Sequence, residues 1–301
     1  MAKYNLVLSQ DMREESEKEN RKDWERLEGK FSLSGVGKEL PMCVMVPGYN
    51  NNAKFRLEYN LNSIFQQNYT NYKVVLVNDA STDGTDELYQ KYFQFYNIDP
   101  KKYVYVQNKI RVTALRNIYE NSIKHCGLED VVMTLDADDE FIGQNVLQVF
   151  NWGYQRKKSG VLYSNFYWYQ QPSSLMYGFT SEYPAKDKDS SNYRKVAMKF
   201  SHLRSYRNEL IHQIKPKDLQ DKEGVFFTIA YDMALFFPLM ELSCGRVNKI
   251  EGEYHYLYNT GTGLNDYTQR GRQVATDQQV RRKEKYGCYK AFDDKMNAIK
   301  D

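Results

Sequence analysis

Three carboxylates fall within four residues at Asp136, Asp138 and Asp139, in the segment DADD. Like charges repel one another, so such a cluster needs a cation or good solvation. Carboxylate oxygens suit Mg²⁺ and Mn²⁺, which usually bind through one or two carboxylates together with the phosphates of a substrate. An acidic helix cap would explain the same residues. The motif alone leaves both interpretations open, with Asp138 and Asp136 as candidate metal ligands.

Two upstream loops carry side chains that suit a nucleobase. Tyr49, in the turn PGYN, offers a ring on which a flat base can stack, and Asp79 can accept a hydrogen bond from a base N–H. Ser81 and Asp83 are typical turn and cap residues, and Gly84 permits a tight bend. Ordinary turn chemistry would explain any one of these loops, but polar loops at successive strand ends favour a binding site.

Arg116 is a further candidate for a phosphate or base contact, because its guanidinium can bind either. The alternative is a surface ion pair with Glu120, four residues further along the same predicted helix. Both interpretations remain open.

The elements that must position these residues alternate regularly between strand and helix. The apolar pattern predicts strands over 42–46, 73–77, 103–106 and 131–135, and helices over 56–67, 85–95, 113–123 and 144–154. This alternation predicts an α/β fold with a mostly parallel sheet, right-handed crossovers and flanking helices. Ligands bind such sheets at the carboxyl ends of the strands, which is where the polar clusters lie.

The pattern changes after residue 160, where we expect a mixed second half. The segment 161–169 (VLYSNFYWY) predicts a long aromatic strand, and 172–191, rich in Ser, Lys and Asp, predicts a mobile loop. The remaining expectations are strands over 226–230 and 253–258, a helix over 232–242 and a polar helical tail from 269.

We therefore divide the chain into four segments. They are a charged N-terminal arm (1–40), a ligand-binding half (41–160), an acceptor-side half (161–265) and a polar C-terminal tail (266–301). The arm is expected to be a solvated helix or, alternatively, a docking element for a protein partner.

Composition excludes several classes of protein. The net charge is only +3, from 42 basic and 39 acidic residues, so we expect no nucleic-acid partner. The apolar fraction of 41% is enough for a sizeable core. The longest apolar run, 225–240, is interrupted by Asp232 and Pro238 and is shorter than the ~20 residues of a membrane-spanning helix.

The cysteines and the N-terminus indicate the compartment. The four cysteines form no CxxC pair, so a zinc site and a redox dithiol are not expected, and a reducing compartment is the default. The first 20 residues contain no apolar stretch typical of a secretory signal. We expect a cytoplasmic protein without a transmembrane segment.

Four linked motifs, in this order and spacing, resemble the family 2 glycosyltransferases of the GT-A fold. They are VMVPGYN (44–50), VNDASTDGT (77–85), ALRN (114–117) and LDADD (135–139). The resemblance covers about residues 41–150. It implies a GT-A, Rossmann-like sheet, a nucleotide-sugar donor (most often a UDP-sugar), a divalent cation and transfer with inversion at the anomeric carbon.

The resemblance also assigns roles to single residues. It implies that Tyr49 and Asp79 hold the uracil with Arg116 nearby, that Asp136 lies near the ribose or the metal, and that Asp138 is the metal ligand bridging to the diphosphate. It extends the nucleotide-sugar contacts to Pro47, Asn50 and Ser81.

In the second half, segments 202–207, 231–241 and 256–259 resemble a subset of these enzymes. Members of the family place a catalytic carboxylate just after a strand here, which implies Asp232 as the general base; a helix N-cap is the alternative. A carboxylate in an otherwise apolar run is poised to accept a proton. Glu241 is the rival base, although nine residues further on a structural salt bridge is the more natural role.

Three further residues are candidates for contacts with the acceptor or the diphosphate. Arg204 and Arg207 can bind the diphosphate or the acceptor, and Trp168 can form a platform for a sugar ring, with a packed core strand as its alternative.

The competing hypothesis is a non-catalytic glycosyltransferase-like scaffold subunit of a larger assembly. The DADD motif and Asp232 argue against it, because an inactive fold has no need of such costly carboxylates. A sugar-1-phosphate nucleotidyltransferase would need a Gly-rich, Arg-containing loop after the first strand, which 47–50 is not. The segment QRGRQ (269–273) only loosely resembles the QxxRW signature of processive members, since it lacks the Trp.

Overall fold

The computed structural model describes residues 38–51, 56–170, 174–260 and 270–299. Most of the predicted N-terminal arm, residues 1–37, lies outside these ranges, so its role as a docking element stays a prediction. No helix within the described ranges is both long enough and apolar enough to cross a membrane.

The first half is a parallel α/β unit, as the alternating pattern predicts. Its strands are β1 (Met42–Gly48), β2 (Tyr72–Asn78), β3 (Tyr103–Gln107) and β4 (Val131–Thr134), and its helices are α2 (Arg56–Phe65), α3 (Thr85–Phe95), α4 (Ala114–His125) and α5 (Val146–Lys157). β1 is buried along its whole length and pairs in parallel with both β2 and β4. The polar loops that follow β1, β2 and β4 therefore meet at one edge of the sheet.

The second half extends the same sheet. It adds β5 (Glu140–Phe141), β6 (Val161–Gln170), β7 (Ser174–Gly178), β8 (Arg204–Arg207) and β9 (Val247–Asn259) to give the order β3-β2-β1-β4-β8-β6-β9-β5, with β7 paired to β6. β8 runs antiparallel to both β4 and β6. The observed architecture is thus a mostly parallel sheet with a mixed second half, and the predicted fold class is confirmed.

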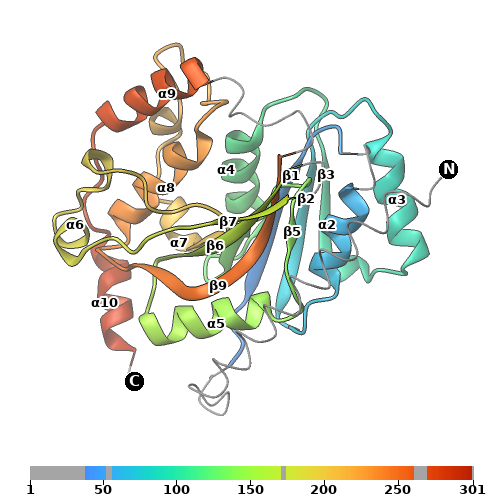
Figure 1. The fold of residues 1–301 in the computed structure, drawn as a ribbon, viewed down its shortest axis with the longest axis horizontal. Coiled ribbons are helices and arrows are strands. Elements are labelled where there is room, and N and C mark those ends of the chain that lie inside the picture. The colour runs from blue at the N-terminus through green and yellow to red at the C-terminus, as the bar shows by residue number, and fades with distance from the viewer. Residues whose placement is uncertain (1–37, 52–55, 171–173, 261–269, 300–301) are drawn as a thin grey trace.

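Helices cover both faces of the sheet (Figure 1). One apolar cluster packs α2, α3 and α5 against one face, and a second packs α4, α7 (Asn208–Ile211), α8 (Tyr231–Leu242), α9 (Arg270–Arg282) and α10 (Lys290–Ala298) against the other. The short helix α6 (Ala185–Asp189) and the 3₁₀ turns Pro100–Lys102, Tyr193–Lys195 and Pro216–Leu219 complete the described elements. The two clusters sandwich the sheet as a three-layer core.

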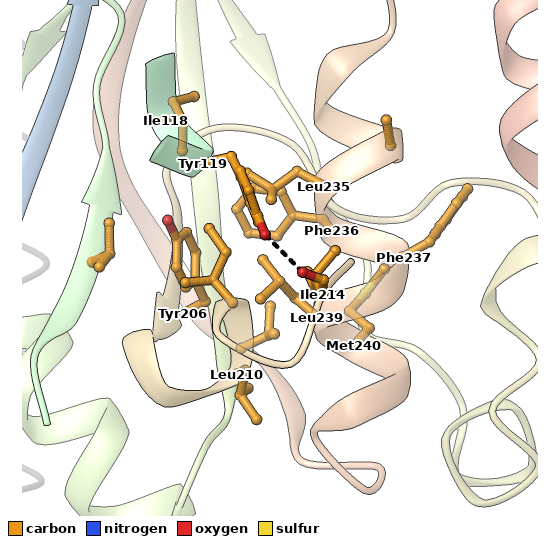
Figure 2. Packing of buried hydrophobic residues seen from close by; sticks show 14 of the residues in the cluster. Ile118, Tyr119, Tyr206, Leu210, Ile214, Leu235, Phe236, Phe237, Leu239 and Met240 are labelled. Carbon is orange, nitrogen blue, oxygen red and sulfur yellow. Dashed lines mark hydrogen bonds between the residues drawn. The ribbon is translucent and has the colours of Figure 1, made fainter. Parts of the chain in front are cut away.

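Helix α8 is the centre of the second cluster (Figure 2). Its residues from Met233 to Leu242 are all buried, which explains why its apolar side chains show no single stripe. Tyr119 of α4 packs beside it and donates a hydrogen bond of 2.8 Å to the carbonyl of Ile214. Because most of α8 is enclosed, its exposed first turn is fixed in position relative to the sheet.

One buried ion pair agrees with the sequence expectations, and two disulfides depart from them. Glu241 forms a buried ion pair with Arg194, with Nε–Oε1 at 2.5 Å, so its structural role is confirmed. Disulfides join Cys43 to Cys126 and Cys244 to Cys288. Sequence spacing gave no sign of these pairs, because folding brings together cysteines that are 83 and 44 residues apart.

The disulfides remove the support that the cysteines gave to a reducing compartment, because such bonds persist mainly in oxidising ones. The cytoplasmic location therefore stays a prediction. Two local predictions are also wrong. The segment 172–191 contains β7 and α6 as well as loop, and 226–230 forms no strand beyond an isolated bridge between Phe226 and Gln220.

Candidate active site

A cavity of about 540 Å³ lies at the carboxyl edge of the sheet. Its walls come from the loops after β1, β2 and β4, from the N-terminal turns of α4 and α8, and from β9 and α9. Among the sequence candidates, those that line it are Pro47, Tyr49, Asp79, Asp136, Asp138, Arg204 and Asp232. The fold thus brings residues from both halves of the chain to one cavity.

One end of the cavity is built around Tyr49 and Asp79. The guanidinium carbon of Arg111 lies 3.8 Å from the centre of the Tyr49 ring, in a cation–π stack. The Asp79 carboxylate accepts hydrogen bonds from the backbone N–H groups of Val112 (2.9 Å) and Thr113 (2.8 Å). Asp79 therefore fastens the loop that carries Arg111 against Tyr49.

Asn50 and Ser81 join the first two loops instead of lining the cavity. The backbone N–H of Asn50 donates to Ser81 Oγ at 2.9 Å, and Asn50 Oδ1 accepts from the backbone N–H of Thr82 at 2.9 Å. A side chain at Gly48 would bring its Cβ within 2.8 Å of the Ala137 Cβ, so β1 can pass close to the DADD loop only with glycine here.

Asp136 and Asp138 of the DADD segment line the cavity, and Asp139 is buried beside them. Both Asp136 oxygens accept from the Tyr231 hydroxyl, at 2.8 and 3.0 Å. Asp139 is 1% exposed and accepts from the Tyr256 hydroxyl (2.5 Å) and the Asn259 N–H (2.7 Å). Burial raises the pKa of Asp136, and burial together with the neighbouring acids raises the pKa of Asp139 well above its usual range.

The same residues fit a divalent cation. One ligand atom each from Asp136, Asp139 and His202 lies within 4.8 Å of the other two, and Asp138 lines the same cavity. Nδ1 of His202 is buried and has no hydrogen-bond partner among the residues that the structure describes. Burial lowers the pKa of His202 well below its usual range, which favours the neutral imidazole that binds metals. Two carboxylates and an imidazole suit Mn²⁺ and other first-row ions.

Asp232 lies in the first turn of α8 and lines the same cavity as Tyr49. Its Oδ2 is 3.1 Å from Nη1 of Arg204, and its side chain is 24% exposed, so that it is accessible from the cavity. Arg204 in turn donates to the Tyr231 hydroxyl at 3.4 Å, which donates to Asp136. Asp232 therefore belongs to a polar network. The buried apolar part of α8 begins at the next residue, Met233.

The other candidates lie outside the cavity. Arg116 pairs with Glu120 at 2.7 Å, the alternative that the sequence left open. Arg207 points to the opposite face of β8 from Arg204, where it lies 5.1 Å from the Tyr154 ring centre and burial lowers its pKa. Trp168, on β6, is 38% exposed. Strand alternation separates the two arginines, since they are an odd number of residues apart.

Several cavity residues were not among the candidates: Arg111, His202, Tyr231 and Arg272. His202 and Tyr231 fall inside segments that the resemblance had marked, so their position in the motif was a usable signal. Arg272 lies in the QRGRQ segment at the start of α9. Arg111 carries no local signal, because only the loop held by Asp79 brings it to Tyr49.

Comparison with known proteins shows the family and the fold of this chain. The model of glycosyl transferase family 2 matches residues 43–215, more than half of the chain. Similar solved structures are S. aureus TarS (19% identity, TM-score 0.55, covering 79% of this chain and 39% of TarS) and its fragment 1–349 in complex with UDP-GlcNAc (18%, 0.54, covering 79% and 66%). A third is the Pyrobaculum calidifontis mannosyltransferase PcManGT with GDP-Man and Mn²⁺ (16%, 0.53, covering 81% and 64%). No curated protein matches.

At these identities the structures show the fold alone, and the chain spans little more than a third of full-length TarS. The match of the family model over more than half of the chain carries the assignment. This protein belongs to glycosyl transferase family 2, with a GT-A fold.

Proposed function

We propose that this protein transfers a hexose-type sugar from a nucleotide-diphosphate donor, UDP-sugar in the first place, to an acceptor hydroxyl with inversion at the anomeric carbon. The observation that carries the proposal is the continuous network Asp136–Tyr231–Arg204–Asp232, which joins the acids after β4 to the carboxylate of α8 across one cavity. The neighbours bound to UDP, UDP-GlcNAc and GDP-Man support a nucleotide-sugar donor and make GDP the second nucleotide to test.

The donor is expected to lie along the cavity with its base at Tyr49, Asp79 and Arg111 and its diphosphate beside the acids. Mn²⁺ or Mg²⁺ held by Asp138 and Asp136, with Asp139 and His202 close by, would neutralise the leaving diphosphate as a Lewis acid. Because Asp136, Asp139 and His202 form the tight group of ligand atoms, all three belong to the proposed site together with Asp138.

Asp232 is the proposed general base. It takes the proton of the acceptor hydroxyl as the acceptor oxygen forms its bond to the anomeric carbon and the bond to the diphosphate breaks on the opposite face. Arg204 holds Asp232 in position through the 3.1 Å contact. Attack opposite the leaving group produces inversion.

The test is UDP binding by calorimetry, with and without Mn²⁺, combined with a turnover assay over a panel of UDP- and GDP-sugars. Asp138→Asn should lose metal-dependent UDP binding, whereas Asp232→Asn should bind UDP normally and lose transfer by at least 10²-fold, the usual contribution of a general base. Near-normal turnover in Asp232→Asn would remove it as the base. Failure of the wild type to bind UDP or GDP under both conditions would favour the scaffold hypothesis.

A further inference from the structure

A row of aromatic side chains leads away from the acids along β6 and β9. The His202 ring is stacked between Tyr256 (centroids 4.5 Å apart) and Tyr258 (4.8 Å), and Tyr258 lines the cavity. The Tyr256 hydroxyl donates to Asp139, so the row begins at the DADD acids. Burial raises the pKa of Tyr258, and the nearby carboxylates of Asp139, Asp136 and Asp138 raise it further.

Trp168 continues this row toward solvent. It is the direct neighbour of Tyr258 in the parallel pairing of β6 with β9, and its ring centroid is 6.2 Å from that of Phe166. Side chains alternate along a strand, so Phe166 and Trp168 share one face while Tyr167 faces the other, where it stacks on Tyr254. We call Phe166, Trp168 and Tyr258 the aromatic ledge.

One ring of the aromatic ledge packs against β7, the strand that pairs with β6. A Cβ on Gly178 would lie only 2.4–2.7 Å from the Phe166 ring, so this ring rests directly on the β7 backbone. Met176 is paired with Trp168 in the β6–β7 register and is equally exposed, at 38%. Trp168 therefore lies beside Met176, partly open to solvent, next to a Phe166 ring that is held against β7.

We propose that the aromatic ledge is the acceptor subsite and that it binds a pyranose ring, which makes the acceptor a glycan. This inference rests on the proposed function, since it needs the acceptor hydroxyl to approach Asp232 from the cavity that Tyr258 lines. A pyranose has an apolar C–H face that can stack on an aromatic ring of the ledge and polar edges that can reach the cavity that Tyr258 lines. The nucleobase would occupy the separate Tyr49–Arg111 end, so the donor does not compete for Trp168.

The experiment compares Trp168→Ala, Trp168→Phe and a matched control, Tyr177→Ala. Tyr177 is 51% exposed on the adjacent strand but is paired with Tyr167, and so lies on the opposite face of the same hairpin. The probes are methyl pyranosides and simple disaccharides, with glycerol and a serine-containing peptide as hydroxyl compounds without a sugar ring. Binding is followed by saturation-transfer NMR with and without UDP and Mn²⁺, and transfer by acceptor KM and kcat.

We expect at least one pyranoside to receive saturation from the wild type on its ring protons. Trp168→Ala should raise the acceptor KM on the order of tenfold, the effect of losing one aromatic stack, while kcat and the Kd for UDP change less than about twofold. Trp168→Phe should keep most of the affinity, and Tyr177→Ala should behave as wild type.

Wild type that binds UDP but none of the pyranosides, or a Trp168→Ala variant with unchanged pyranoside binding and KM, would overturn the inference and leave the proposed function intact. Equal loss in Tyr177→Ala would also overturn it, because the effect would then belong to the hairpin and not to the ledge. If the wild type did not bind UDP, the proposed function would be contradicted instead. The pyranoside measurements without UDP would then still show whether the ledge binds a sugar ring.

Discussion

Replacing Asp139 with Asn should change how the stability of the protein depends on pH. Burial and the neighbouring acids raise the pKa of Asp139 well above its ordinary value of 3.8, so the folded state binds its proton more tightly than the unfolded state does. The free energy of unfolding therefore falls as pH rises from about 4 toward the raised pKa. Asp139→Asn removes this titration, and the variant should lose less stability over the same range.

The size of the effect follows from the shift. Each unit by which the pKa is raised costs about 1.4 kcal/mol of stability once the pH has passed through that unit. Because burial raises the pKa of Asp139 well above 3.8, wild type should lose more stability than the variant between pH 4 and pH 8. The amide side chain that replaces Asp139 in the variant has one oxygen, so it can accept from only one of the two donors that Asp139 binds, the Tyr256 hydroxyl and the Asn259 N–H. That loss does not depend on pH and cancels in the difference.

The assay is urea unfolding at several pH values in EDTA, with Glu223→Gln as control. The Glu223 side chain is 60% exposed beside Lys222, so its neutralisation should leave the pH profile unchanged. Adding Mn²⁺ at pH 7.5 should stabilise wild type more than Asp139→Asn, because an ion that binds only the folded state stabilises it by mass action. If the free energy of unfolding of wild type and of Asp139→Asn depended on pH in the same way, the reasoning that the charged Asp139 carboxylate destabilises the fold would be refuted.

Three further changes test other parts of the structure. Arg111→Ala should weaken UDP binding about two- to fivefold in calorimetry, since exposed cation–π stacks contribute about 0.5–1 kcal/mol. Arg116→Ala should leave UDP binding unchanged, and equal effects of the two variants would contradict this geometry. Glu241→Gln leaves Arg194 buried without its counter-charge and should lower the free energy of unfolding by about 3–5 kcal/mol in urea titrations. Cys288→Ser should lower it by about 2–4 kcal/mol under non-reducing conditions, and a change within error would show that the Cys244–Cys288 link adds nothing.

The first half of the fold was predictable because its signals are local. Each strand there is a short apolar run, and each helix repeats its apolar residues at helical spacing, so period and turn residues are enough to place both. The second half depends on long-range pairing. The four-residue strand β8 is defined by its partners β4 and β6, and β7 exists only because β6 pairs with it.

The candidate site shows the same division. Tyr49, Asp79 and the DADD acids could be found because they directly follow strands of a parallel sheet. Arg111 could not, since only the hydrogen bonds of Asp79 to Val112 and Thr113 hold its loop at the cavity. To predict that Arg204 lies in the cavity and Arg207 outside it, one would have needed the register of β8, which depends on its partner strands.

That register limits how this protein can change by mutation. β8 pairs Arg204 with Thr134 and Arg207 with Val131, so Arg204 reaches Asp232 only while this alignment holds. Inserting or deleting a single residue within β8 would turn Ser205 toward the cavity and force the Arg204 guanidinium into the opposite apolar layer. The chain before His202 can change in length without disturbing this register, whereas α7 begins at Asn208, directly after β8. Within the strand itself only changes by an even number of residues preserve the side that faces the site.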